Sequence, residues 1–163
     1  MVVIGVDTSL RSTGFGVIET AGNRIVALEA GRVRNASDLP LTQCLVAIHE
    51  KISSLIALHR PDVMAVEGVI YAKNANTMLA LGQARGAVLL AAAENKLPVY
   101  DYEPRRVKMS VCGNGLAEKE QVQRMVKTLL SLDKLPQNDA ADALAIAICH
   151  AHSNLRLLQK APL

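Results

Sequence analysis

The chain has 163 residues, of which 50% are hydrophobic and 20% charged, and its formal net charge is +3 at pH 7. This length suits one domain with a single core, and the composition is that of a globular protein and not of a disordered one. The aromatic content is 2%, which argues against a protein that stacks single-stranded bases on rows of aromatic rings.

The sequence predicts neither an exported nor a membrane protein. Its three cysteines form no CxxC pair, which argues against a disulfide framework or a zinc site and favours a reducing compartment. The apolar run at the N-terminus has no basic leader and ends at Asp7, so we expect no signal peptide. The most apolar stretch, 80–93, is too short to span a bilayer. We therefore expect a cytoplasmic protein.

Hydrophobic spacing predicts a mixed α/β fold. Short β-branched runs predict strands over 2–6, 13–18, 24–33, 63–66 and 98–102. Apolar residues at helical spacing predict helices over 41–59, 76–96, 104–111, 118–132 and 139–152. The turns between the first three strands suggest an antiparallel meander, and the later alternation of helix and strand suggests parallel strands. We expect a five-stranded sheet flanked by helices, one domain over 1–152 and a C-terminal tail over 153–163.

Four acidic residues are the most informative feature. Asp7 directly follows the apolar run VVIGV, and Glu67 directly follows VMAV, so both are expected at the ends of central strands. Asp139 and Asp142 are three residues apart at the start of the helix DAADALAIAI, which puts them on one face. The alanines of this helix would let it approach the sheet closely and bring the four carboxylates together.

Four converging carboxylates repel one another unless a divalent cation compensates the charge or some of them are protonated. Oxygen ligands suit Mg²⁺ or Mn²⁺, and two such ions about 3.5–4 Å apart form a phosphodiester-cleaving site. Taken singly, each acid also fits an ordinary role in a turn, at a strand end or at a helix N-terminus. The spacing alone leaves open a nuclease and another metal-dependent phosphate enzyme.

Four segments of the sequence resemble the RuvC family of crossover junction endodeoxyribonucleases. They are VIGVDTSLRSTGFGV, VEGVIYAKNANTMLALGQARGA, RRVKMSVCGNGLAEKEQVQRMV and NDAADALAIAICH, and the similarity runs from Met1 to about His152. The resemblance implies an RNase H-like fold. It also implies a homodimer that resolves four-way (Holliday) DNA junctions by paired symmetric nicks, in recombination and DNA repair.

The resemblance assigns roles to six residues. These are the metal-binding carboxylates Asp7, Glu67, Asp139 and Asp142, and the DNA-facing lysines Lys108 and Lys119, which support cleavage. It implies Mg²⁺, two ions per subunit with Mn²⁺ able to substitute. The reaction it implies is in-line attack of a metal-bound water, which leaves 5′-phosphate and 3′-hydroxyl ends. A branch-migration helicase complex of the RuvA-RuvB type is the implied partner.

Two departures from the family pattern bear on DNA contact. Thr8-Ser9 replaces a common Pro-Gly in the turn after Asp7, and Ile70 stands where a bulky aromatic wedge is often found. Either Ile70 or the following Tyr71 is then expected to enter the junction. The segment 104–127 carries six basic residues against two acidic ones, which fits phosphate contacts and also a solvated helix face. Further candidates for DNA contact are Arg11, Lys73, Arg85, Arg105 and Arg106.

The predicted helix 76–96 is apolar on most faces and must be covered on more than one side. Burial within the domain is one explanation. A homodimer interface is the other, and a two-fold symmetric junction that needs two cuts favours it.

Three other functions fit parts of the sequence. An IGVDTS start also resembles an actin-like ATPase, but one domain without a second Gly-rich loop argues against it. A non-catalytic DNA-binding module would usually have lost one of the four carboxylates. A relative that acts on RNA hybrids stays open.

Overall fold

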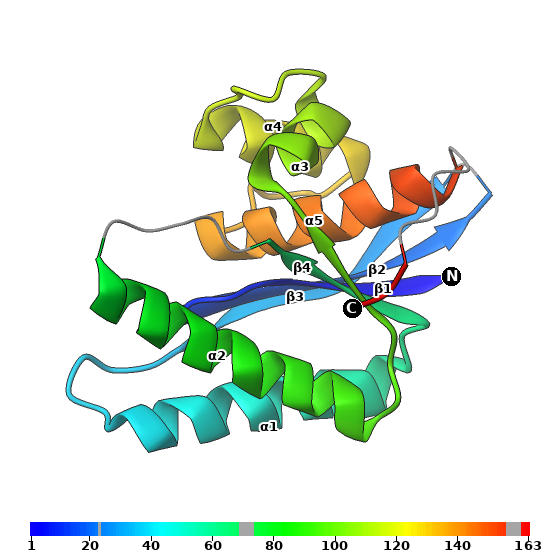
Figure 1. Ribbon diagram of the computed structural model, residues 1–163. Helices are drawn as coiled ribbons and strands as arrows, with labels where there is room; N and C mark the ends of the chain where they lie inside the picture. Colours follow the sequence, from blue (N-terminus) through cyan, green and yellow to red (C-terminus); the bar gives the residue numbers. More distant parts are fainter. Residues whose placement is uncertain (23, 69–73, 156–160) are drawn as a thin grey trace.

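The computed structural model describes residues 1–22, 24–68, 74–155 and 161–163. One sheet has the strand order β3-β2-β1-β4-β5. Its strands are β1 (Val2–Asp7), β2 (Ser12–Ala21), β3 (Arg24–Arg34), β4 (Val63–Glu67) and β5 (Val99–Tyr102). The helices are α1 (Leu41–His59), α2 (Ala75–Glu94), α3 (Pro104–Cys112), α4 (Lys119–Leu129) and α5 (Asn138–Leu155). Helices α1 and α2 cover one face of the sheet, and α5 with α3 and α4 covers the other (Figure 1).

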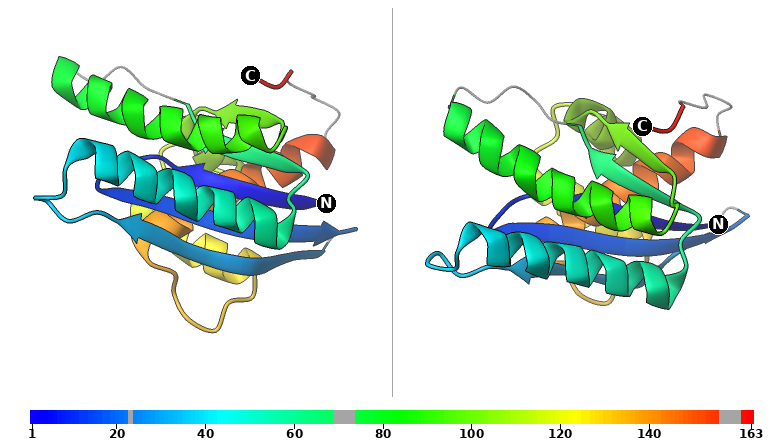
Figure 2. Two further views of the ribbon diagram at one scale, coloured as in Figure 1. Left: turned by 90° about the horizontal axis from the view of Figure 1, so that it is seen from below. Right: turned by 60° about the horizontal axis from the view of Figure 1, so that its bottom comes forward.

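The pairing of the strands confirms the predicted mixed sheet. Strand β1 pairs antiparallel with β2, which pairs antiparallel with β3. On its other side β1 pairs parallel with β4, and β4 pairs parallel with β5. The two views of Figure 2 show the sheet between its two helical layers. This sheet puts the ends of β1 and β4 side by side, because Val6 pairs with Val66.

Strand β3 contains an irregularity that the sequence pattern did not reveal. Val17 pairs with Glu29 but Ile18 pairs with Ala27, so Leu28 is an extra residue in β3. Such a bulge exchanges the faces of a strand, since side chains alternate. Ala27 accordingly packs on the α5 side, whereas Val33, six residues later, packs on the α1 side.

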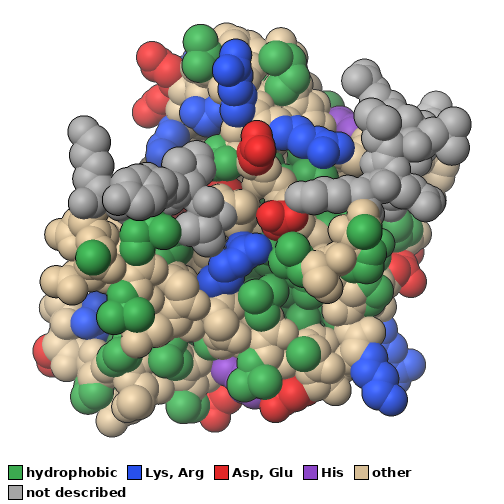
Figure 3. Space-filling model, viewed as in Figure 1, with side chains coloured by type: hydrophobic (Ala, Val, Ile, Leu, Met, Phe, Trp, Pro, Cys, Tyr) green, Lys and Arg blue, Asp and Glu red, His purple; other side chains and the backbone are tan. Residues whose placement is uncertain are grey.

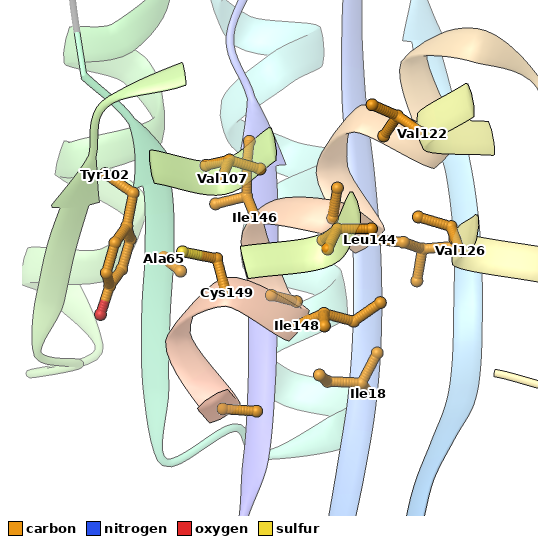
Figure 4. Close-up of a cluster of buried hydrophobic side chains, with 14 of the residues drawn as sticks. Ile18, Ala65, Tyr102, Val107, Val122, Val126, Leu144, Ile146, Ile148 and Cys149 are labelled. Atoms are coloured by element: carbon orange, nitrogen blue, oxygen red, sulfur yellow. The ribbon is translucent and has the colours of Figure 1, made fainter. Parts of the chain in front are cut away.

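Alternation along β1 divides the aliphatic core into two layers. Val3 faces α5, and Ile4 and Val6 face α1 and α2. Figure 4 shows the α5 layer, in which Leu144 and Ile148 of α5 lie among side chains from the sheet, α3 and α4. The burial of β1 on both faces, predicted from its continuous apolar run, is confirmed.

Helix α1 has the length and hydropathy that would also suit a membrane span. Its side chains Cys44, Ile48, Ile52, Leu55 and Ile56 are buried in the protein. Four of these belong to the core layer formed with β1, β4 and α2, namely Ile48, Ile52, Leu55 and Ile56. We therefore regard α1 as a core helix.

Helix α5 lies unusually close to the centre of the sheet. A Cβ atom added to Gly5 would be 2.1 Å from the carbonyl oxygen of Ala143, and one added to Gly14 would be 2.0 Å from that of Asp139. The predicted close approach of the alanine-rich helix is thus present, and it needs glycine on the sheet as well as alanine on the helix. The helix also continues to Leu155, three residues beyond the predicted end.

Replacement of Gly5 by alanine should test this contact. The added methyl group would overlap the backbone of α5, so we expect Gly5→Ala to lower the free energy of unfolding by roughly 3 kcal/mol or more. Gly68→Ala is the matched control, because its Cβ would make an ordinary contact of 3.4 Å with the carbonyl oxygen of Tyr102. Urea denaturation of both variants measures the difference. Equal stability of the two variants would contradict the proposed constraint.

Candidate active site

The structure brings the four predicted acids to one end of the sheet. Asp7 is the last residue of β1 and Glu67 is the last residue of β4. Both side chains point to the α5 side, since Gly5 and Ala65, two residues earlier in each strand, face that helix. Asp139 and Asp142 lie in the first turns of α5.

Asp7 is at the electrostatic centre of this group. Its pKa is raised from an ordinary value of 3.8 to about 7, and burial of the carboxyl group is the largest cause. The negative charges of the other three acids also raise the pKa, with Glu67 contributing most, whereas the positive charge of Lys119 lowers it. The other three carboxylates are therefore all close enough to influence Asp7.

The predicted lysines lie beside the same acids. Burial is the main cause that raises the pKa values of Glu67 and Asp142, and the charges of Lys108 and Lys119 oppose this rise in both. Lys119 Nζ is 3.8 Å from Asp142 Oδ2, although 70% of the lysine side chain is exposed. Helices α3 and α4 thus direct positive charge toward the acids from outside the sheet.

Asp139 has two partners that the sequence analysis did not identify. The hydroxyl group of Ser12 donates a hydrogen bond to Asp139 Oδ2, and Arg32 Nη1 lies 3.3 Å from the same oxygen. Arg32 reaches this oxygen because it pairs with Gly14, and Gly14 pairs with Asp7. A row across three strands therefore joins Arg32 to Asp7 beneath the start of α5.

The carboxyl groups suit a hard divalent cation, because all four offer oxygen ligands and because their mutual repulsion needs a positive charge to offset it. Within the described ranges, however, no three His, Cys, Asp or Glu side chains are arranged to hold one metal ion. Asp139 is turned to Ser12 and Arg32, and Asp142 to Lys119. These contacts compete with a cation for the same oxygens.

Two predicted DNA contacts, Arg11 and Arg85, are engaged within the protein. Arg85 donates a hydrogen bond to the carbonyl oxygen of Glu67, and burial lowers the pKa of this guanidinium. Arg11 donates to the carbonyl oxygens of Ala36 and Leu39. Arg85 thus supports the end of β4, and Arg11 holds the loop between β3 and α1.

The remaining predicted contacts divide into two groups. Arg105 and Arg106 are exposed on α3, and the Arg106 guanidinium lies 5.2 Å from the centre of the Tyr102 ring, the geometry of a cation–π contact. Ile70, Tyr71 and Lys73 lie outside the described residues.

The sequence holds one signal for Arg32 and Arg34, which were not among the predicted site residues. Arg32 and Arg34 are two residues apart in a strand, so their side chains share a face, and this basic pair faces the same side as Asp7. Only the register of β3, which the bulge sets, shows which face that is.

Comparisons with known proteins agree with this architecture. A family model described as "Crossover junction endodeoxyribonuclease RuvC" matches residues 3–150. The protein of that name from Citrifermentans bemidjiense is 48% identical over 153 residues, which are 94% of this chain and 93% of that protein.

Solved structures agree as well. T. thermophilus RuvC in complex with Holliday junction substrate has a TM-score of 0.92 at 34% identity, covering 100% of this chain and 99% of that chain. A yeast mitochondrial Holliday junction resolvase, 12% identical, shares the fold with a TM-score of 0.65 over 90% of this chain and 76% of that chain. The RNase H-like fold and the family resemblance are confirmed, and the chain belongs to the RuvC family of crossover junction endodeoxyribonucleases.

Proposed function

We propose that this protein resolves four-way (Holliday) DNA junctions by a pair of symmetric, metal-dependent nicks, during recombination and DNA repair in the cytoplasm. The observation that carries the proposal is the convergence of Asp7, Glu67, Asp139 and Asp142 in a chain that is a member of this family. The described relative from T. thermophilus, solved with a Holliday junction substrate, supports the choice of DNA.

The four carboxylates are proposed to hold Mg²⁺, two ions per subunit, with Mn²⁺ able to substitute. Bound divalent cations supply an activated water and offset the charge that develops on the phosphate. The residues must first release their present partners, so Arg32 leaves Asp139 and Lys119 leaves Asp142. Asp7, whose pKa is raised to about 7, must be ionised to hold a cation, and a nearby positive charge would favour the ionised form.

Lys108 and Lys119 are proposed to act on the DNA. Both lie on the open side of the acids, on α3 and α4, where a strand that approaches Asp142 would meet their ammonium groups. Once a cation has offset the carboxylates, these lysines are available to bind the phosphates on either side of the scissile bond. Products with 5′-phosphate and 3′-hydroxyl ends are expected.

The second subunit is proposed to bind through α2. Its buried side chains are Ala84, Val88, Ala91 and Ala92, and its opposite face exposes Leu79 and Leu90 by 62% and 54%. Hydrophobic side chains lie at the surface over α2 in Figure 3. Between these leucines lie Gly82 and Gly86, where an added Cβ would meet nothing within 4 Å. A second helix could therefore approach this face closely, and a two-fold dimer would present two sites to a symmetric junction.

Two further parts of the proposal concern contacts that the protein would make during the reaction. Ile70 or Tyr71 is proposed to enter the junction as an apolar or stacking wedge. A branch-migration helicase complex of the RuvA-RuvB type is the proposed partner that delivers the junction.

Cleavage of labelled four-way junctions tests the function. With Mg²⁺ we expect paired nicks at symmetric positions, and no nicks without metal. Asp7→Asn should reduce cleavage at least about 100-fold, because loss of even an indirect metal partner costs 10- to 100-fold. Asp133→Asn, an exposed acid in the loop after α4, is the matched control and should cleave normally. Junction binding by the wild type without cleavage in Mg²⁺ would instead indicate a non-catalytic module.

The pH dependence of stability tests the electrostatics of Asp7 in metal-free buffer. Because its folded pKa is raised, Asp7 supports folding fully below about pH 3.8, and this contribution is lost as the pH rises toward about 7. Asp7→Asn should therefore be more stable than the wild type above pH 7, by about 4 kcal/mol at about 1.36 kcal/mol for each pH unit between 3.8 and 7. The two proteins should be equally stable near pH 4, as measured by urea denaturation.

Addition of Mg²⁺ at pH 8 should narrow this difference in stability. The cation stabilises only a protein that binds it, so the melting temperature of the wild type should rise and that of Asp7→Asn should stay nearly constant. An equal rise in both variants would argue against Asp7 as a ligand.

The dimer is tested by Leu90→Glu. A charge buried at an apolar interface is strongly unfavourable, so this variant should scatter light as a single 17.5-kDa chain, while the wild type at micromolar concentration scatters as twice that mass. Leu58→Glu on α1, where the leucine is 70% exposed, is the matched control and should remain a dimer. A monomeric wild type, or disruption by Leu58→Glu alone, would contradict the α2 interface.

A further inference from the structure

A basic pocket adjoins the acidic site, because Ser12 and Arg32 line it and also contact Asp139. It is open to solvent, has a volume of about 400 Å³, and we call it the arginine pocket. Its side chains are almost all polar: Arg11, Arg32, Arg34, Ser12, Asn35 and Ser37. The lining contains three arginines and no acidic side chain, so its charge suits an anion.

The register of the sheet explains why the arginines meet. Arg34 pairs with Ser12 across β2 and β3, and Arg32 pairs with Gly14 in the same ladder. Because side chains two residues apart in a strand share a face, Arg32 and Arg34 both point to the side of the sheet on which α5 begins. Arg11, in the segment before β2, completes the set of arginines that line the pocket.

Hydrogen bonds fix the far wall of the pocket. Arg11 donates to the carbonyl oxygens of Ala36 and Leu39, while Asn35 Nδ2 lies 2.8 Å from the carbonyl oxygen of Leu10 and 3.3 Å from that of Cys44. The loop that follows β3 is thereby tied to the loop that precedes β2. A ligand would enter a site whose walls are already ordered, which lowers the entropy lost on binding.

The charges of the pocket are largely uncompensated. Arg34 is exposed and forms no ion pair with any residue that the structure describes. The guanidinium of Arg11 donates to neutral carbonyl oxygens. Arg32 has one acidic partner, Asp139, at 3.3 Å, and this carboxylate belongs to the candidate active site. Divalent cation binding at the acids would free Arg32 as well.

We propose that the arginine pocket binds a backbone phosphate of the DNA strand that enters the candidate active site, an inference that rests on the proposed function. Guanidinium groups bind phosphate oxygens through paired hydrogen bonds, so two exposed arginines on one strand face suit a phosphodiester. Ser12 and Arg32 line the pocket and also contact Asp139. A phosphate held there would fix the position of the strand relative to the acids without reading its sequence.

Equilibrium binding of a four-way junction tests the pocket, measured across a salt series with Asp7→Asn protein so that no cleavage occurs. Each phosphate contact contributes about 0.9 to the slope of log K against log salt concentration. The Arg34→Gln substitution, added to the Asp7→Asn protein, should therefore reduce the magnitude of this slope by about 0.9 and weaken binding roughly eightfold near 0.1 M salt. Arg34→Lys, which keeps the charge, should retain most of the slope.

The matched control is Arg24→Gln. Arg24 is exposed at the other end of the same strand, ten residues away and so about 33 Å along it at about 3.3 Å per residue. Its loss should leave both slope and affinity unchanged. Thermal melting of each variant confirms that it is folded.

The outcomes separate the two proposals. If the Asp7→Asn protein and the wild type fail to bind junctions at all, the proposed function is wrong. If they bind but Arg34→Gln and Arg24→Gln behave alike, the function stands and the pocket proposal is overturned. The pocket proposal is also overturned if Arg34→Gln abolishes stabilisation of the protein by inorganic phosphate but leaves junction binding unchanged, because the pocket would then bind free phosphate and not DNA.

Discussion

Helix α5 touches the backbone of the sheet at Gly5 and Gly14, with no side chain from the sheet between them. This contact positions the rest of the site. It sets the first turns of α5 directly above the ends of β1 and β4, so that Asp139 and Asp142 come within electrostatic range of Asp7. Two aliphatic core layers hold this arrangement. One packs α1 and α2 against the sheet, and the other packs α5 between the sheet and the helices α3 and α4.

The same contact creates an electrostatic strain. Four acids are gathered in partly buried positions, and burial, together with repulsion from the other three acids, raises the pKa of Asp7 to about 7. Ser12, Arg32 and Lys119 relieve part of the strain with hydrogen bonds and positive charge. A site of this kind lowers the stability of the free protein in exchange for affinity toward cations, which is a common relation between active sites and stability.

Much of this arrangement follows from the sequence, because its strongest signals are local. Apolar runs that end at Asp7 and Glu67 give the strand ends, and the three-residue spacing of Asp139 and Asp142 gives the helix face. The resemblance to a family supplied the lysines, whose position near the acids depends on packing of α3 and α4. Ser12, Arg32 and Arg34 were missed because their roles depend on strand register. The engagement of Arg11 and Arg85 with backbone carbonyls is likewise a tertiary contact, which no spacing reveals.

The bulge at Leu28 bears on how the chain tolerates changes in length. Before it, odd-numbered residues of β3 such as Ala27 pack beneath α5; after it, odd-numbered Val33 packs beneath α1. Insertion of one uncharged residue between the bulge and Arg32 would turn both arginines of β3 away from Asp139, while the strand itself could keep its place in the sheet. A change that alters neither net charge nor hydrophobic content would thus abolish the basic side of the site. In this strand, residue count matters to the site as much as residue type.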